Sequence, residues 1–169
     1  MRIIYIWIIL TCFLVFSCDE PNGPIPLAHP KLSLESEVEI VNPDEVFKIS
    51  IIIDNVDIPV YGAYLKISID TTKINITENN SFQIGDYWGE NSISFDREEN
   101  GNLHITMVKT YFFEGAVSTG ILGELNFKAL DSGETELNFL NQNCEFYNSL
   151  GEIIDIPNLE FENISIKIN

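Results

Sequence analysis

The stretch Ala63-Tyr64-Leu65-Lys66-Ile67-Ser68-Ile69 decides the fold, because its side chains alternate between apolar and polar over seven residues. Successive side chains of an extended strand point to opposite faces, so this alternation predicts a strand with one buried and one solvated face. The odd-numbered residues are expected to face the core. Tyr64, Lys66 and Ser68 are expected to face outward.

The same alternation recurs along most of the chain, in short segments separated by turn residues. Asn100-Gly101 lies between two such segments and predicts a hairpin. The predicted strands are Leu32–Ile40, Val46–Ile53, Ala63–Ile69, Ser92–Asp96, Leu103–Tyr111, Leu122–Leu130, Thr135–Leu140, Cys144–Tyr147 and Leu159–Ile168. After residue 18, no segment combines helical apolar spacing with helix caps. About nine short strands without helices predict an all-β sandwich or barrel.

The N-terminal residues have the composition of a secretory signal. Arg2 precedes an apolar run from Ile3 to Phe16, which is shorter than the roughly 20 residues that a membrane-spanning helix needs. Val15-Phe16-Ser17-Cys18 resembles the lipobox of bacterial lipoproteins. This resemblance implies cleavage after residue 17, a diacylglycerol on the Cys18 thiol and acylation of the new N-terminus. The alternative is an N-terminal membrane anchor that is not cleaved.

The predicted domains are a signal peptide at 1–17, a lipid-anchored tether at 18–31 and one domain at 32–169. The tether carries four of the seven prolines of the chain, which favour extended backbone. The predicted location is the bacterial cell envelope, in the outer membrane or on the cell surface. The sequence leaves open which membrane and which leaflet hold the lipid.

Charge and cysteine content exclude several classes of function. The chain has 26 acidic and 9 basic residues and a net charge of −17, which disfavours binding to nucleic acid and to anionic lipid headgroups. The predicted domain retains only Cys144 of the three cysteines. An intramolecular disulfide and a two-cysteine zinc site are therefore excluded there, and Cys144 is expected to pack as a small apolar residue.

Three groups of short motifs, in this order, are similar to the cohesin domain. They are an alternating strand that ends at Asp70 and is followed by Lys73–Ile76, the segment Gly120–Ala129 followed by Gly133–Phe139, and the turn Asn148–Ile154. The Tyr-Asp-Pro signature of the family is replaced here by Ile69-Asp70-Thr71. The resemblance covers nearly all of residues 32–169 and implies a nine-stranded jelly-roll β-sandwich.

The resemblance to cohesins also implies a function. Cohesins bind dockerin modules across one sheet face, which includes the strand equivalent to Ala63–Ile69 and the neighbouring hairpin. The expected function is that of a non-catalytic cell-envelope lipoprotein that binds a protein partner, with a dockerin-like module as the first candidate. A carbohydrate-binding module and a structural envelope protein are the alternatives.

Two groups of residues are candidates for ligand binding. Tyr64, Lys66, His104 and Thr106 share the outward parity of their strands and predict a partly apolar patch for a protein partner; ordinary surface residues are the alternative. Tyr87 and Trp88 lie in a glycine-flanked loop, where an exposed tryptophan could stack on a sugar ring of a polysaccharide. The alternative places Trp88 at one end of the core.

No catalytic or cofactor motif is found in the sequence, so the protein is predicted not to be an enzyme. Only two histidines are present; His29 lies in the tether, and His104 is expected to be an exposed surface residue. Asp96-Arg97-Glu98-Glu99-Asn100-Gly101 resembles the start of a calcium loop, but position twelve is Met107 in place of the glutamate. A hairpin turn is favoured there. No cofactor is predicted, and calcium binding at another acidic loop stays open without a particular site.

Overall fold

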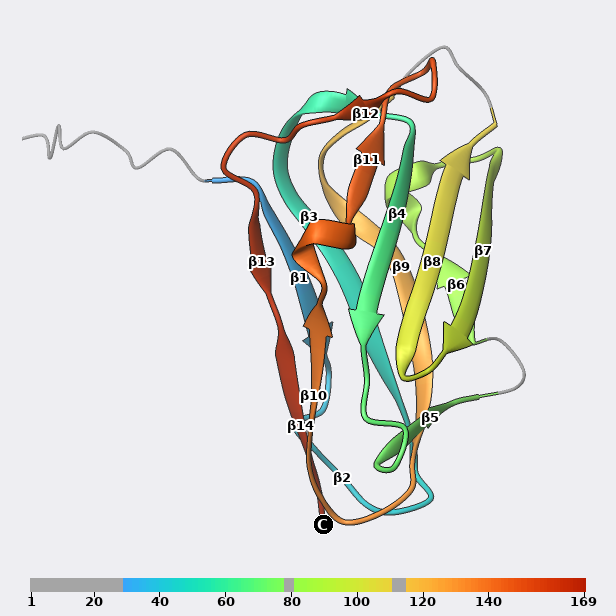
Figure 1. Cartoon of the computed structure of the whole chain (residues 1–169), viewed down its shortest axis with the longest axis vertical. Coiled ribbons are helices and arrows are strands. Elements are labelled where there is room, and N and C mark those ends of the chain that lie inside the picture. The colour runs from blue at the N-terminus through green and yellow to red at the C-terminus, as the bar shows by residue number, and fades with distance from the viewer. Residues whose placement is uncertain (1–28, 78–80, 111–114) are drawn as a thin grey trace, which may run out of the picture.

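Two β-sheets are stacked face to face in the computed structural model, which describes residues 29–77, 81–110 and 115–169 (Figure 1). The first sheet is built around the long strands β3 (Val46–Val60) and β9 (Ala116–Ala129). Its other strands are β13 (Glu160–Glu162), β1 (Lys31–Ser36), β5 (Ile74–Ile76) and β6 (Phe82–Ile84). Pairing in this sheet is antiparallel except between β1 and β13.

The second sheet is built around β4 (Gly62–Ser68), which pairs with β8 (Asn102–Lys109) along its whole length. The hairpin partner of β8 is β7 (Ser92–Glu99). The other strands are β12 (Ile153–Ile154), β11 (Glu145–Tyr147), β10 (Gly133–Phe139), β14 (Ile164–Ile168) and β2 (Ile40–Val41). β10 and β11 pair with successive parts of β4 and are separated by the short 3₁₀ helix η2 (Asn141–Asn143).

The prediction of an all-β jelly-roll sandwich is confirmed, but the number of strands is not. The described residues contain fourteen strand segments, several of them only two or three residues long. The predicted strand Leu32–Ile40 is divided into β1 and β2, and Leu159–Ile168 is divided into β13 and β14. In both cases the chain passes from one sheet to the other. A change of sheet keeps the apolar side inward, so alternation alone does not reveal it.

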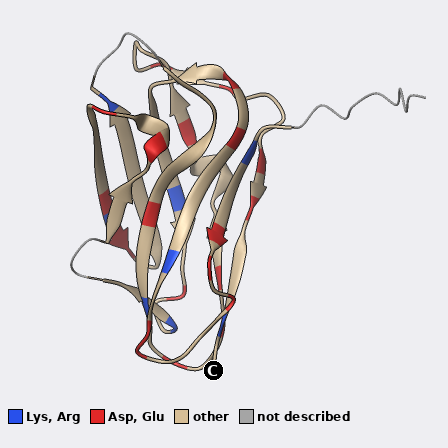
Figure 2. Cartoon of the chain, turned by 180° about the vertical axis from the view of Figure 1, so that it is seen from behind, with Lys and Arg blue, Asp and Glu red and all other residues tan. Residues whose placement is uncertain are grey.

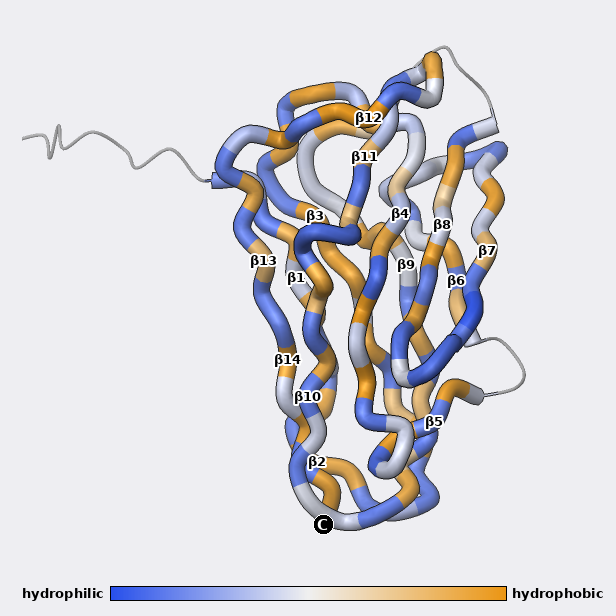
Figure 3. The backbone as a smooth tube through the Cα atoms, in the orientation of Figure 1, coloured by the Kyte–Doolittle hydropathy of each residue, from blue (hydrophilic) through white to orange (hydrophobic). Residues whose placement is uncertain are grey.

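The core is formed where the inward side chains of the two sheets meet. Figure 3 shows the alternation of hydrophobic and hydrophilic residues along β4 and β8. The fully buried side chains include Ile49, Ile51 and Ile53 of β3, Leu65 and Ile67 of β4, Leu103, Ile105 and Met107 of β8, and Leu125 and Phe127 of β9. The predicted inward face of Ala63–Ile69 is therefore confirmed.

Trp88 belongs to this core and is not an exposed aromatic residue. Its side chain is fully buried at the end of the 3₁₀ helix η1 (Asp86–Trp88), and its Nε1 donates a hydrogen bond of 2.9 Å to the carbonyl of Leu122. Tyr87 is also buried, and its hydroxyl donates to the carbonyl of Ala116 at 3.1 Å. The sugar-stacking surface predicted at Tyr87 and Trp88 is therefore wrong, because neither ring is accessible to a ligand.

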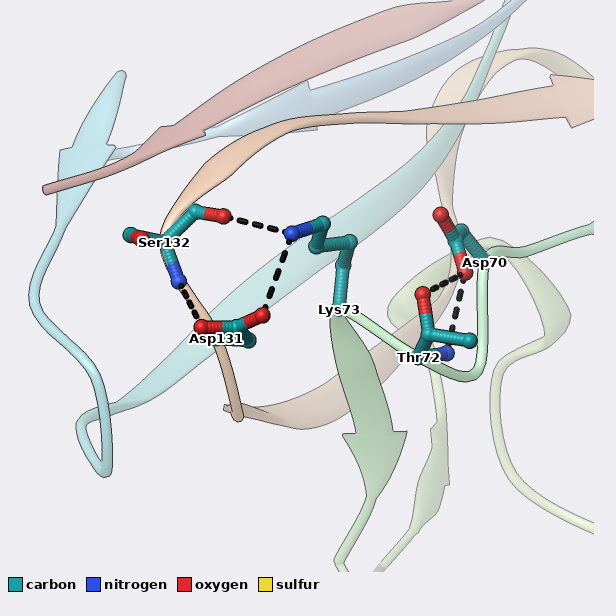
Figure 4. Close-up of polar contacts among 5 residues, drawn as sticks. All are labelled: Asp70, Thr72, Lys73, Asp131 and Ser132. Carbon is teal, nitrogen blue, oxygen red and sulfur yellow. Dashed lines mark hydrogen bonds and ion pairs between the residues drawn. The ribbon is translucent and has the colours of Figure 1, made fainter.

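The turn after β4 holds its shape without the proline of the family signature (Figure 4). Asp70 accepts hydrogen bonds from the hydroxyl of Thr72 at 2.6 Å and from its backbone N–H at 2.9 Å, and these bonds lower the pKa of Asp70. Lys73 then reaches the turn after β9, where Nζ contacts Asp131 at 3.4 Å and donates to the carbonyl of Ser132 at 2.5 Å. Side-chain hydrogen bonds thus take over the role of a rigid turn residue.

The predicted signal peptide, the lipidation site Cys18 and the tether up to residue 28 lie outside the described residues. Within 29–77, 81–110 and 115–169, no helix is long and apolar enough to span a bilayer.

The predicted hairpin at Asn100-Gly101 is confirmed, and it gives a first test of the fold. Both residues have positive φ, 54° and 74°, as a two-residue turn of this type requires. We expect Gly101→Ala to lower the free energy of unfolding by about 1–2 kcal/mol, because a Cβ is strained at this φ and would lie 3.2 Å from the carbonyl oxygen of Ile69. Urea denaturation measures the effect. Asn100→Gly is the control and should be tolerated, and equal stability of Gly101→Ala and wild type would contradict the turn.

Burial of Trp88 gives a second test. We expect Trp88→Ala to lower the free energy of unfolding by about 3–5 kcal/mol, because it leaves a large cavity in the core. Trp88→Phe should cost clearly less, since it retains most of the ring and Leu122 still accepts a hydrogen bond from the N–H of Gly85 at 2.9 Å. Thermal and urea unfolding of both variants measure the difference. Wild-type stability of Trp88→Ala would show that the ring is exposed.

Candidate functional site

The outward side chains of β11, β4, β8 and β7 form one continuous surface, which we call the outer face. These strands lie side by side in Figure 1. Their register arranges the side chains in rows across the strands. From one end of the face to the other, the rows are Tyr147, Gly62, Val108 and Ile93; then Glu145, Tyr64, Thr106 and Phe95; then Lys66, His104 and Arg97; and then Ser68, Asn102 and Glu99.

The four residues predicted for partner binding all lie on this face. Tyr64 is paired with Thr106, and Lys66 is paired with His104 in the next row. All four side chains are half-buried. The structure thus brings the predicted residues together, while their role in binding stays a prediction.

His104 is less exposed than the sequence predicted. The Tyr64 hydroxyl and His104 Nδ1 are 2.7 Å apart and share a hydrogen bond, with the ring centroids at 6.1 Å. Lys66 and Arg97 flank the imidazole on the two neighbouring strands. Neighbours on both sides cover part of the ring, which a single-strand pattern does not reveal.

One end of the outer face is apolar and open to solvent. Phe95 is 66% exposed, Ile93 46% and Val108 36%. The three side chains lie in adjacent rows of the outer face. Large apolar side chains gathered on a surface are typical of a binding site for another protein. Ile93 and Phe95 were missed in the sequence, although the Asn100-Gly101 turn fixes their register.

A pocket of about 360 Å³ adjoins this apolar end. It is lined by Tyr61, Gly62, Tyr64, Thr106, Val108, Tyr147 and the turn Asn148, Ser149 and Gly151. Gly62 leaves room in the row between Tyr147 and Val108, where a larger side chain would fill the pocket. The pocket is therefore a recess with three tyrosines in its wall, at one end of the outer face.

Tyr147 presents a neutral hydroxyl at the edge of this pocket. The hydroxyl donates a hydrogen bond to the carboxylate of Glu145, the next outward residue of β11. Burial and the neighbouring carboxylate raise the pKa of Tyr147 to about 12. The phenol therefore stays protonated at physiological pH, and the pocket wall stays uncharged there.

Two other predicted features have structural roles. Cys144 is a half-buried free thiol that packs against the core, and burial raises its pKa, which disfavours the reactive thiolate. The calcium-like segment that starts at Asp96 forms the hairpin between β7 and β8. In the part of the chain that the structure describes, no group of three or more His, Cys, Asp or Glu side chains is placed to hold a metal ion.

Comparison with solved structures supports the fold. A non-cellulosomal cohesin from the archaeon Archaeoglobus fulgidus matches with 16% identity and a TM-score of 0.66, over 84% of this chain and 92% of that one. The cohesin of a type II cohesin–X-dockerin complex from Acetivibrio cellulolyticus matches with 13% identity and a TM-score of 0.71, over 83% of this chain and all of that one. A third cohesin, solved in complex with a dockerin from the same organism, matches with 18% identity and a TM-score of 0.68, over 82% and 98%.

The comparison with protein families agrees with the structural matches. None of the curated proteins compared with the chain matches it. The family model of the cohesin domain matches residues 31–156, which is most of the chain. On this match and on the two-sheet fold, the chain belongs to the cohesin domain family.

Proposed function

We propose that the chain binds a dockerin-like protein module across its outer face. Cohesin domains are non-catalytic protein-interaction domains that bind dockerin modules, which agrees with the prediction that the protein is not an enzyme. The resemblance to cohesins supports a partner that lies over the strand equivalent to Ala63–Ile69 and the neighbouring hairpin. In this chain those elements are β4, β8 and β7.

The observation that carries the proposal is the apolar end of the outer face. Phe95, Ile93 and Val108 are exposed beside a pocket lined by three tyrosines. Covering such a surface with a partner removes apolar area from water and contributes roughly 25 cal/mol for each Å². Aromatic residues beside a pocket are also the usual anchors of protein interfaces.

The outer side of the other sheet has a different character. Its lysines form ion pairs with acidic residues, Lys48 with Glu124 at 3.0 Å and Lys128 with Asp44 at 2.6 Å. Paired surface charges are well solvated and contribute little to binding or stability. Val46 on β3 is 62% exposed beside these pairs, so it offers a matched apolar control for Phe95.

The first test of this function is capture of a partner by the full chain from an extract of the source organism, with and without calcium. We expect recovery of a protein that bears a dockerin-like module. Phe95→Asp should weaken its affinity about thirtyfold, because an aromatic anchor of an interface typically contributes about 2 kcal/mol.

Val46→Asp is the control and should bind like wild type. Equal affinity of the Phe95→Asp variant and wild type would contradict binding at this face. If both variants bind a polysaccharide and no protein is captured, the protein-binding function itself is wrong.

We also propose that the chain is attached to the cell envelope through lipid on Cys18. The support is the lipobox-like Val15-Phe16-Ser17-Cys18 and the proline-rich tether that follows. An acidic domain gains little from anionic headgroups, so acyl chains must supply the attachment, and more than one chain is needed for stable anchoring. The outer membrane or the cell surface is the proposed location.

The lipid anchor is tested by metabolic labelling of cells with a radioactive fatty acid. Wild type should incorporate label and sediment with membranes. Cys18→Ala should lose the label, because it removes the acceptor thiol, and Cys144→Ala should keep it. Equal labelling of Cys18→Ala and wild type would contradict lipidation at this residue. Membrane attachment of Cys18→Ala without label would favour the alternative of an uncleaved anchor.

A further inference from the structure

A row of basic side chains crosses the centre of the outer face. Lys66 on β4 is paired with His104 on β8, and His104 is paired with Arg97 on β7. Neighbouring strands are about 4.8 Å apart, so the three side chains span roughly 10 Å. We call these three residues the basic row.

The basic row is unusual for a chain with a net charge of −17, in which acidic residues outnumber basic ones along the ribbon (Figure 2). Lys31, Lys48, Lys73 and Lys128 all form ion pairs with acidic residues of other strands or turns. Among the described residues, Lys66 has no such partner, a property that it shares with Lys109 and Lys167.

The acidic side chains beside the row do not neutralise it. Glu99 contacts Arg97 at 3.3 Å, but both side chains are more than half exposed, so the pair is weak. Glu145 lies diagonally across from Lys66, but the Glu145 carboxylate accepts a hydrogen bond from the Tyr147 hydroxyl. Within the described residues, the basic row therefore stays available to an acidic group from outside.

His104 adds a hydrogen-bond donor to the basic row. Its Nδ1 is engaged by the Tyr64 hydroxyl, and no residue of the described ranges bonds to its Nε2. When Nδ1 accepts the tyrosine hydrogen, Nε2 carries the imidazole hydrogen and can donate it. A carboxylate above the row then meets two cationic side chains and one N–H donor, an arrangement that strengthens hydrogen bonds to an anion.

The distance between the basic row and the tyrosine-lined pocket indicates how far apart the two contacting side chains of the partner lie. Gly62 at the pocket and Lys66 in the row are four residues apart on β4, which corresponds to about 13 Å along a strand. Two turns of an α-helix span about 11 Å. One helix lying along β4 can therefore reach both places.

We propose that the partner presents a carboxylate to Lys66, His104 and Arg97 and an apolar side chain to the tyrosine-lined pocket, roughly two helical turns away. The inference rests on the proposed binding function and specifies the chemistry of the module that the face selects. Opposite charge at the row favours this partner and disfavours modules that carry a basic residue at the same position.

The probe for this inference is a displayed library of a two-helix module with randomised surface positions, selected on the purified full chain. The selected binders should be enriched in Asp or Glu two turns from a large apolar residue. Lys66→Glu should weaken their binding at least tenfold, and replacing the acidic residue of the binder with lysine should restore most of the loss. Lys167→Glu, the same change on β14 of the same sheet, is the control and should bind like wild type.

The outcomes separate this inference from the function beneath it. Binders that lose affinity with Phe95→Asp but not with Lys66→Glu would overturn the acidic partner and leave the outer face as the binding site. Enrichment of basic residues at the randomised positions would overturn it as well. Binders that are insensitive to both variants would contradict the outer face itself. Urea unfolding is measured for Lys66→Glu as well. A midpoint equal to that of wild type shows that a loss of binding does not come from misfolding.

Discussion

The pairing of β4 with strands on both of its edges is the constraint on which the rest of the structure depends. β8 pairs with all seven residues of β4, and β10 and β11 together cover most of the opposite edge. Because side chains alternate along a strand, this register fixes both surfaces of the sheet at once. Ala63, Leu65 and Ile67 fill the core, while Tyr64 and Lys66 stand at the centre of the outer face. A slip of one residue would expose the isoleucine and bury the lysine.

The same register arranges the outer face as a gradient. The end near Gly62 is aromatic and apolar, the centre carries the basic row, and the far end carries polar and acidic residues. An apolar recess contributes affinity, whereas complementary charges mainly contribute selectivity and the rate of association. Among the described residues, the opposite sheet carries paired charges on its outer side. We therefore propose that the sheet with the outer face binds the partner and that the other sheet supports it.

Local patterns predicted much of this arrangement, and contacts distant in sequence account for the rest. Alternation around Leu65 and the turn at Asn100-Gly101 predicted the fold class and the four outward residues. Counting outward from that turn also pairs Arg97 with His104 and Phe95 with Thr106. The position of Tyr147 beside Gly62 depends on a pairing between residues 85 apart in the sequence, which no local signal carries. For Trp88 the sequence left an exposed loop position and a position at one end of the core open, and the structure shows burial in the core, because a short 3₁₀ helix turns the ring inward.

Hydroxyl-radical footprinting of the full chain, alone and saturated with the dockerin-bearing protein that it captures, tests the central claim most directly. The account predicts that oxidation of Phe95, Tyr64 and Tyr147 falls on binding, while Val46, Val117 and Leu130, which are exposed on or beside the first sheet, keep their free-state rates. Protection of the first sheet with unchanged oxidation of Phe95 and Tyr64 would contradict it.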